Sequence, residues 1–181
     1  MFYHTKYRSP IGEITLACDC DGNNLVGLWT HSQKYHGSTI PEAMTIEGDI
    51  PLFERTKKWL DSYFSGGKPS ISELPLAPIG SEFRQGVWSI LRGIPYGEVS
   101  TYGAVARKMA VNMGRKSMSS QAVGGAVGHN PISIIIPCHR VVGSNGSLTG
   151  FAGGIQMKIK LLELEGVDMT GLFVPKKGTA L

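Results

Sequence analysis

Alternating apolar and polar positions near the N-terminus predict a β-hairpin. From Ile14 to Cys20 every second residue is apolar, which is the period of a strand with one buried face. Asp21-Gly22 is a typical hairpin turn sequence, and the apolar residues 25–29 that follow provide the second strand. The first element that the chain predicts is therefore a pair of adjacent antiparallel strands.

A helical period replaces the alternation farther along the chain. Residues 30–50 are polar and irregular and predict no element, whereas apolar residues over 52–64 recur as on a helix that ends at Gly66-Gly67. Residues 68–80 contain three prolines and little periodicity, which is typical of a domain boundary. We therefore divide the chain into an N-terminal domain, a C-terminal domain and a tail without readable order, at residues 1–75, 80–168 and 169–181.

Three serines mark helix starts in the second domain. Ser81, Ser100 and Ser119 can each accept a hydrogen bond from an otherwise unsatisfied backbone N–H at a helix N-terminus. The helices that they predict cover residues 83–91, 101–109 and 120–127, and a final helix covers 155–165. Between the last two, residues 134–136 predict a short buried extended run, and Asn145-Gly146 predicts a hairpin or wing.

Composition and charge narrow the class of protein. The 181 residues are 41% hydrophobic and 18% charged, which excludes a globally disordered chain. The net charge of +4 permits a polyanionic partner without requiring one. The N-terminus resembles no secretory leader, and no apolar run reaches the ~18 residues of a membrane span. We therefore expect a cytoplasmic protein with no membrane association.

The three cysteines are too few for a disulfide scaffold. Cys18 and Cys20 are expected to share a strand face, where a bridge between such close neighbours would be strained. We expect both to be reduced, and Cys138 stands alone in the sequence. This pattern is typical of a reducing cytosol.

The sequence Pro137-Cys138-His139-Arg140 combines a thiol with a base and a cation. A free thiol with a pKa of ~8.5 is only a few per cent thiolate at neutral pH, so a nucleophilic cysteine needs a base or a positive field. In an extended stretch neighbouring side chains point to opposite sides, so His139 reaches Cys138 only where the chain turns or through a bridging water. Taken alone, the pair is more typical of a buried structural cysteine beside an unrelated histidine.

A carboxylate on the last predicted helix provides a third member. Ile155, Ile159 and Leu162 form one stripe, and the next position on it is Glu165. Because a carboxylate rarely stays unpaired on a core-facing stripe, Glu165 could accept the second N–H of His139 and fix its tautomer. The alternative is a helix-end glutamate that bends out to solvent.

The helix predicted at 120–127 is unusually rich in glycine. Gly124 and Gly125 lie in its middle, where each glycine costs about 1 kcal/mol, so something must approach closely there. Two short helices with a basic joint are typical of a helix-turn-helix; the basic residues are Arg107, Lys108, Arg115 and Lys116. A helix reduced to Gly and Ala can press against the ~6 Å minor groove of DNA without reading bases. Glycine-mediated helix packing is the alternative.

Asn130 lies immediately before Pro131, a pair that typically starts a turn. The Asn130 side chain could also hold the helix-turn-helix against the cysteine loop. The residues alone leave both interpretations open.

Residues 136–142, Ile-Pro-Cys-His-Arg-Val-Val, resemble the active-site motif of the methylated-DNA–protein-cysteine methyltransferases, which repair 6-O-alkylguanine in DNA. Blocks at residues 95–102, 122–126 and 145–154 resemble the same family in the same order. The likeness is dense over 83–167 and extends to the N-terminal part only in outline. It implies an α+β fold, with a ribonuclease-H-like α/β N-terminal domain before a helical winged helix-turn-helix domain.

The resemblance also implies a role for each matching residue. Cys138 would accept the alkyl group, His139 would be the base acting through a water, and Glu165 would orient His139. Asn130 would be a structural hinge. Substrate contacts are implied for Tyr102, for the backbone of Cys138, Val141 and Ala152, and for Phe151 near the pocket. DNA contacts are implied for Gln121, Ala122, Gly124, Gly125, Ser144, Arg115 and Lys116.

The implied reaction is direct damage reversal in double-stranded DNA, bound through its minor groove by a monomer. After nucleotide flipping, the alkyl group of 6-O-alkylguanine or 4-O-alkylthymine moves to Cys138. The thioether product has no carbonyl for water to attack, so each molecule reacts once and irreversibly. No metal and no cofactor are implied. Some family members bind zinc in the N-terminal domain, but Cys18 and Cys20 do not line up with those ligands.

The sequence departs from the family pattern at three places. Gln121 stands where an arginine usually fills the stack left by the flipped base, so we expect weaker DNA affinity or slower flipping. Phe151 stands where tyrosine is common, which removes one hydroxyl. The loop at 110–118 is longer than usual, and its Arg115 and Lys116 offer additional phosphate contacts.

Three other functions compete with alkyl transfer. A non-catalytic binder of alkylated DNA with the same architecture would lack the cysteine, so Cys138 argues against it. A winged-helix transcription factor would direct long polar side chains at bases, and in this helix only Gln121 qualifies. A cysteine hydrolase built on Cys138 would turn over repeatedly and would have no use for the glycine-rich helix.

Overall fold

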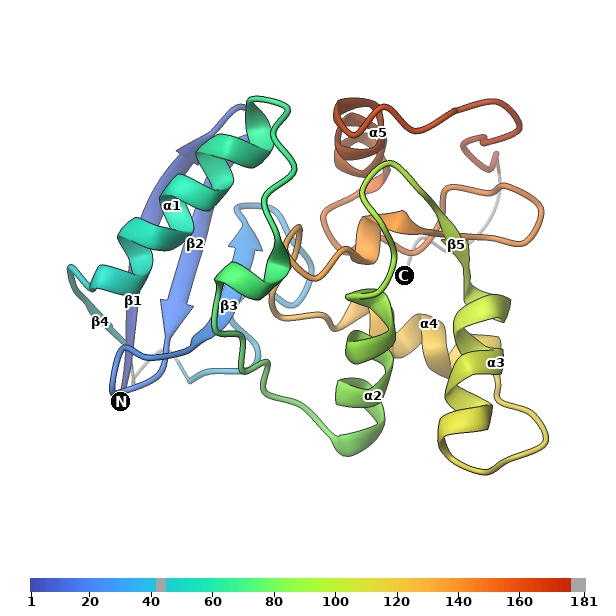
Figure 1. Ribbon diagram of the computed structural model, residues 1–181, viewed down its shortest axis with the longest axis horizontal. Coiled ribbons are helices and arrows are strands. Elements are labelled where there is room, and N and C mark those ends of the chain that lie inside the picture. Colours follow the sequence, from blue (N-terminus) through green and yellow to red (C-terminus); the bar gives the residue numbers. More distant parts are fainter. Residues whose placement is uncertain (42–44, 177–181) are drawn as a thin grey trace. The chain divides into compact units, whose positions relative to one another are not determined.

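The computed structural model describes residues 1–41 and 45–176, which form two compact units (Figure 1). The first unit contains residues 1–80 together with Pro131–Ile135. The second contains Ser81–Asn130 and the chain from Ile136 onward. The segment just before the cysteine motif thus belongs to the first unit, although the surrounding residues belong to the second.

The first unit is built on a four-stranded sheet of order β3-β2-β1-β4. Its strands are β1 (Phe2–Ser9), β2 (Gly12–Cys18), β3 (Leu25–Thr30) and β4 (Thr45–Glu47). The pairs β1–β2 and β2–β3 are antiparallel, whereas β4 runs parallel to β1. The predicted hairpin is confirmed, and Gly22 in its turn has a φ of +69°, which glycine adopts at no steric cost.

Two strands lie outside the sequence prediction. β1 was missed because its residues, Phe-Tyr-His-Thr-Lys-Tyr-Arg-Ser, contain no aliphatic side chain. β4 lies within the stretch for which no element was expected. The prediction that Cys18 and Cys20 share a strand face is wrong, because β2 ends at Cys18 and Cys20 is exposed in the following turn.

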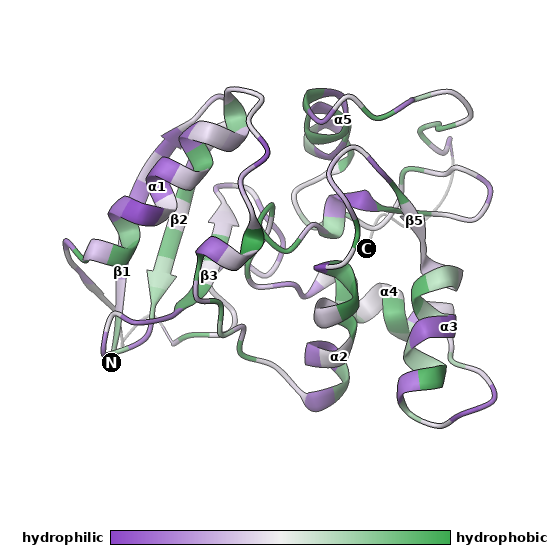
Figure 2. Ribbon diagram, in the orientation of Figure 1, coloured by the Kyte–Doolittle hydropathy of each residue, from purple (hydrophilic) through white to green (hydrophobic). Residues whose placement is uncertain are grey.

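Helix α1 (Pro51–Phe64) confirms the predicted helix and packs against β1 (Figure 1). Pro51 suits its first turn, where the backbone N–H has no partner within the helix. Figure 2 shows polar and apolar residues alternating in bands along α1, as expected for an amphipathic helix, whereas β2 is mostly apolar. The face of α1 toward the core carries Leu52, Phe53, Thr56, Trp59, Leu60 and Tyr63.

Two segments distant in sequence cover the edge of β3. The N–H groups of Leu25 and Leu28 donate to the carbonyls of Pro75 and Pro131, each at 2.8 Å. The N–H of Ser133 returns a hydrogen bond to the Leu28 carbonyl at 3.0 Å, and its hydroxyl lies 3.1 Å from Oε1 of the buried Gln33. These bonds satisfy an edge that would otherwise be open to pairing with another chain, and they hold the segment that leads to Cys138.

The second unit contains α2 (Glu82–Leu91), α3 (Tyr102–Asn112), α4 (Ser120–Gly128) and α5 (Ile155–Leu164). Ser81 and Ser119 cap α2 and α4 as predicted. The predicted cap at Ser100 is wrong. Ser100 pairs with Val141 in a short parallel sheet of β5 (Ser100–Thr101) and β6 (Val141–Val142), and Thr101 caps α3 instead.

The segment before the cysteine is buried as predicted, but it is not extended. Residues 133–136 form turns, in which the Ile135 N–H donates to the Ser133 carbonyl at 2.8 Å. Ile134 has a φ of +70°, a conformation that is costly for a β-branched side chain. The chain then enters a short 3₁₀ helix, Cys138–Arg140.

The region at Asn145-Gly146 contains the predicted turn, which the Gly143 N–H closes by donating to the Ser147 carbonyl at 2.9 Å. Its return arm pairs with the tail, because the Leu148 N–H donates to the Phe173 carbonyl at 2.9 Å. The expectation of no order after residue 168 is thus wrong as far as residue 176. Met169 and Leu172 pack on a core cluster of Val142, Leu148, Leu162 and Val167.

Within the described ranges, no helix has the length and apolarity required to cross a bilayer.

Gly27 leaves room for the indole of Trp29 on the same strand face. A Cβ at position 27 would lie 1.9 Å from Cη2 of Trp29, which is itself buried. We expect Gly27→Ala to lower the free energy of unfolding in urea by about 1–3 kcal/mol, since overpacking displaces side chains. In a Trp29→Leu background the same substitution should cost much less, and equal costs in both backgrounds would contradict the steric explanation.

Candidate active site

Cys138 begins the 3₁₀ turn, and its side chain is nearly buried. Pro137 precedes Cys138. The Cys138 N–H donates to the Ile136 carbonyl at 2.8 Å, and Cys138 is 3% exposed. The chain therefore turns where the sequence analysis required a turn for His139 to approach Cys138. The backbone hydrogen bond from Cys138 to Ile136 fixes the chain just before the turn, and this limits where the sulfur can lie.

His139 and Glu165 form a buried hydrogen-bonded pair. His139 Nε2 lies 2.6 Å from Glu165 Oε1, and both side chains are fully buried. Because a carboxylate only accepts, Nε2 carries the proton in the neutral ring and Nδ1 holds the lone pair. Nδ1 is buried and has no hydrogen-bond partner among the described residues. Glu165 therefore points inward, not into solvent.

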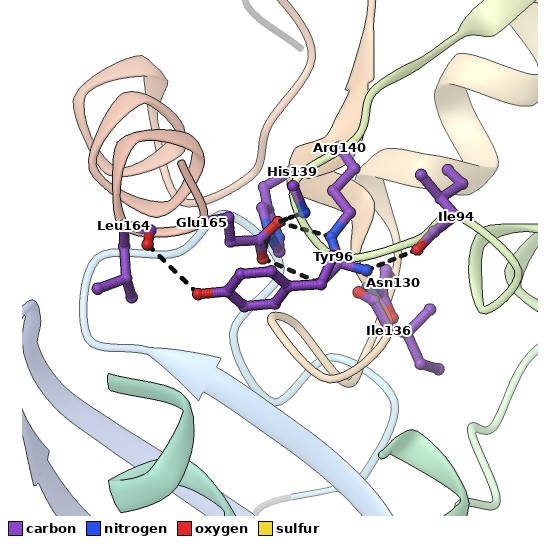
Figure 3. Close-up of polar contacts among 9 residues, drawn as sticks. Ile94, Tyr96, Asn130, Ile136, His139, Arg140, Leu164 and Glu165 are labelled. Atoms are coloured by element: carbon purple, nitrogen blue, oxygen red, sulfur yellow. Dashed lines mark hydrogen bonds and ion pairs between the residues drawn. The ribbon is translucent and has the colours of Figure 1, made fainter. Parts of the chain in front are cut away.

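Arg140 completes an ion pair on the same carboxylate (Figure 3). Its Nε and Nη2 donate to Oε2 and Oε1 of Glu165 at 2.8 and 2.9 Å, and its Nη1 donates to the Ile94 carbonyl at 2.6 Å. Burial alone raises the pKa of Glu165, but the hydrogen bonds from His139 and Arg140 and the positive charge of Arg140 outweigh it and lower the pKa to about 2. Glu165 is an anion at any physiological pH.

The same cluster keeps His139 neutral. Burial lowers its pKa, and the charges of Arg140 and Lys158 lower it further, whereas the hydrogen bond and charge of Glu165 act in the opposite direction. The net shift is downward. A neutral imidazole with Nδ1 unprotonated can accept a proton, which an imidazolium cannot.

The loop before α3 encloses the carboxylate. The Gly97 N–H donates to Glu165 Oε2 at 3.3 Å, and the Tyr96 hydroxyl donates to the Leu164 carbonyl at 3.3 Å (Figure 3). Gly97 has a φ of +79°, and a Cβ there would lie 3.1 Å from the Glu165 carbonyl oxygen. The guanidinium of Arg140 lies over the Tyr96 ring at 5.7 Å. Sequence reasoning assigned no role to these residues.

Asn130 connects the end of α4 to the cysteine loop. Its Nδ2 donates to the Ile136 carbonyl at 2.8 Å, and the residue is 2% exposed (Figure 3). The structure therefore contains the contact that the sequence analysis considered as one of two possibilities.

Lys158 is a buried residue that sequence reasoning missed. It is fully buried on α5, and its Nζ donates to the Val141 carbonyl and, at 2.8 Å, to the Thr149 carbonyl. The Tyr102 hydroxyl donates to that same Thr149 oxygen at 2.8 Å. A signal was present, because Lys158 falls on the apolar stripe, three residues after Ile155.

The aromatic ring of Phe151 packs beside the catalytic candidates. It is 6% exposed and meets the His139 ring edge-on at a centroid distance of 6.4 Å. Ala152 is half-buried next to it. Tyr102 is mostly buried, and burial together with the charge of Cys138 raises the pKa of its phenol, which stays neutral.

Most of the residues expected to contact DNA are exposed, whereas Gly124 is buried and Gly125 is half-buried on α4. Five of them are exposed: Gln121, Ala122, Arg115, Lys116 and Ser144. A Cβ at Gly124 would meet the Tyr102 ring at an ordinary 3.8 Å, and a Cβ at Gly125 would meet nothing within 4 Å. Packing within the chain therefore requires glycine at neither position. The helix α4 is held instead by contacts such as Trp88 Nε1 donating to the Ala126 carbonyl at 2.8 Å.

Comparison with known proteins identifies related chains along most of the sequence. The family described as 6-O-methylguanine DNA methyltransferase matches through its ribonuclease-like domain at residues 2–78 and its DNA binding domain at residues 82–167. A methylated-DNA–protein-cysteine methyltransferase of Haemophilus influenzae is 39% identical, over 91% of this chain and 87% of that protein. A methylated-DNA–protein-cysteine methyltransferase of Methanosarcina acetivorans is 42% identical, over 91% of this chain and 98% of that protein.

Solved structures agree with these relatives. The crystal structure of Mycobacterium tuberculosis OGT in complex with DNA has a TM-score of 0.77 and 38% identity, over 90% of this chain and 92% of that one. The predicted fold class, an α/β ribonuclease-like domain followed by a helical DNA-binding domain, is thereby confirmed. The cysteine motif, its buried partners and this likeness along most of the chain show that the protein belongs to the methylated-DNA–protein-cysteine methyltransferase family.

Proposed function

We propose that this protein repairs DNA by moving the alkyl group of 6-O-alkylguanine, and of 4-O-alkylthymine, onto Cys138 in a single irreversible step. The observation that carries the proposal is the neutral, buried His139 next to Cys138, with Nε2 held by Glu165 at 2.6 Å and Nδ1 left as a proton acceptor. The family names of the relatives at about 40% identity support the same activity. The reaction requires a reduced cysteine, in keeping with the expected cytoplasmic location.

The chemical step moves one proton and one carbon. The Cys138 thiol passes its proton through a water to Nδ1 of His139, which leaves a thiolate. The sulfur forms a bond to the alkyl carbon as the bond from that carbon to the guanine oxygen breaks. The electron pair stays on the guanine, which takes up a proton from solvent and remains in the DNA as an ordinary base. The thioether on Cys138 offers no route back to a thiol.

The substrate base must leave the duplex to reach a sulfur that is 3% exposed. Extruding a nucleotide costs a few kcal/mol, which contacts in the pocket offset. We assign the stacking and phosphate contact to Tyr102, the reading of the guanine amino group to the carbonyls of Cys138 and Val141, and a hydrogen bond to the 6-oxygen to the N–H of Ala152. Phe151 forms an apolar wall beside His139.

We assign the DNA-binding surface to α4 and its flanking loops, acting as a monomer on the minor groove. Gly124 and Gly125 let the helix approach the groove closely, since no side chain of the protein needs their space. Gln121 and Ala122 are exposed at the N-terminus of α4, where Gln121 would take the place of the extruded base. Arg115, Lys116 and Ser144 are exposed and available to phosphates.

Replacing the sulfur tests the assignment of the acceptor directly. Cys138→Ser should retain the fold and lose transfer of a labelled methyl group from a methylated duplex, because a serine hydroxyl has a much higher pKa than a thiol. Mass spectrometry of the wild type should show one added CH2 group on the peptide containing Cys138. Cys20→Ser, which removes an exposed thiol, serves as the control and should react normally. If Cys138→Ser took up as much labelled methyl group as the wild type, the proposal would be refuted.

Gly125→Ala separates packing from DNA binding. The added Cβ meets nothing within 4 Å, and alanine favours a helix by about 1 kcal/mol, so the free energy of unfolding should stay equal or rise by up to that amount. Binding to duplex DNA should weaken several-fold in a fluorescence anisotropy titration, because the methyl group keeps the helix from the groove. A variant that is less stable but binds DNA as the wild type does would reverse this interpretation.

Gln121→Arg tests the departure from the family pattern. The added cation and the longer side chain should tighten binding to a methylated duplex, speed transfer, and steepen the log–log salt dependence of affinity by about one. Gln156→Arg adds the same charge at an exposed position of α5 and should change affinity far less. If both variants behave as the wild type, Gln121 does not contact DNA.

A further inference from the structure

Lys158 places a positive charge inside the second unit, and it forms no ion pair with a carboxylate of residues 1–41 or 45–176. Its side chain is fully buried, and its ammonium donates to the neutral carbonyls of Val141 and Thr149. Glu165 is the only buried carboxylate in the part of the chain that the structure describes, and it accepts hydrogen bonds from two nitrogens of Arg140 and from His139. A buried ammonium without a counter-ion is costly.

The contacts of Lys158 place its ammonium beside the end of the short turn that begins with the reacting cysteine. Val141 directly follows the turn that contains Cys138, so holding its carbonyl keeps Nζ near that turn. The Thr149 carbonyl that Lys158 binds also accepts the Tyr102 hydroxyl at 2.8 Å. Lys158 on α5 and Tyr102 on α3 therefore meet at this carbonyl, and the charge of Cys138 raises the pKa of both side chains.

The charges of the cluster balance only when the sulfur is ionised. Arg140 and Glu165 cancel in their bidentate ion pair, and His139 is held neutral by its surroundings. Lys158 then adds one positive charge, and Tyr102 stays a neutral phenol. A Cys138 thiolate brings the sum to zero, whereas a thiol leaves the buried cluster with a net positive charge.

We propose that Lys158 is the counter-ion of the Cys138 thiolate, and that it stabilises the nucleophile before DNA binds. In this arrangement His139 passes the proton of the thiol on to solvent and returns to its neutral form. The Lys158 ammonium then balances the negative charge of the thiolate. Burial lowers the pKa of Lys158 to about 8, and the charge of Cys138 acts against that shift. The ammonium is thus charged at neutral pH and is lost as the pH rises above about 8.

The inference rests on the proposed function only in taking Cys138 as the nucleophile, so its test uses no DNA. The rate of Cys138 alkylation by iodoacetamide is measured against pH by mass spectrometry of the Cys138 peptide, in wild type, Lys158→Met and Lys158→Arg. The midpoint of the profile should rise by about one pH unit in Lys158→Met, which means about tenfold less thiolate near neutral pH. Lys158→Arg keeps the charge and should keep a midpoint near that of the wild type.

Lys160→Met is the matched control, since Lys160 is exposed on the same helix and should leave the profile unchanged. Near-ultraviolet circular dichroism checks that each variant is folded, and Lys158→Gln replaces Lys158→Met if the latter is not. A folded neutral variant with the wild-type midpoint would overturn the proposal and leave Lys158 as an anchor for two carbonyls. A wild type that reacts with iodoacetamide but takes no methyl group from DNA would instead refute the proposed function.

Discussion

The hydrogen-bonded carboxylate of Glu165 is the interaction on which the site depends. It accepts from His139 Nε2, from two nitrogens of Arg140 and from the Gly97 N–H. A buried carboxylate without such donors would be strongly destabilising, so the surrounding loop and helix end must be in place for the cluster to form. The hydrogen bond to His139 Nε2 also fixes the orientation and the tautomer of the imidazole, while burial and the charges of Arg140 and Lys158 keep the ring neutral. Structure and reactivity at Cys138 therefore rest on one buried anion.

The segment that leads to the cysteine motif is held by hydrogen bonds within each of the two units. Pro131 and Ser133 bond to Leu28 on the edge of the N-terminal sheet, and Asn130 Nδ2 donates to the Ile136 carbonyl. Ile134 keeps an unfavourable φ of +70° between these contacts, which is possible only because they over-determine the segment. The ribonuclease-like domain thus has a structural task in this protein, since its sheet holds the residues that lead to the motif.

Periodicity and capping predicted the parts of the fold that local interactions decide. The hairpin at Asp21-Gly22, the helix ending before Gly66 and the caps at Ser81 and Ser119 follow from residues a few positions apart. Elements that depend on partners distant in the sequence were not predicted. β1 has few aliphatic side chains and is a strand because it pairs with β2 and β4, and the tail is ordered by the bonds between Phe173 and residues 146–148. Lys158 was missed for the same reason, because the carbonyls that make a buried lysine tolerable lie at Val141 and Thr149.

Some residues are unfavourable for their local structure, such as a glycine within a strand or helix or a buried lysine. They divide into two kinds, according to whether other residues of the chain offset the unfavourable energy. Gly27 weakens a strand, but the Trp29 indole occupies the space, and Gly97 accommodates a positive φ beside the Glu165 carbonyl. Gly125 and Lys158 have no such compensation: nothing of the described chain fills the space beside Gly125, and no carboxylate of the described residues balances Lys158. Since natural sequences depart from local rules chiefly where function demands it, the missing partner is expected among the groups that take part in the reaction. For Gly125 that partner is the groove of the DNA, and for Lys158 it is the charge that appears on sulfur.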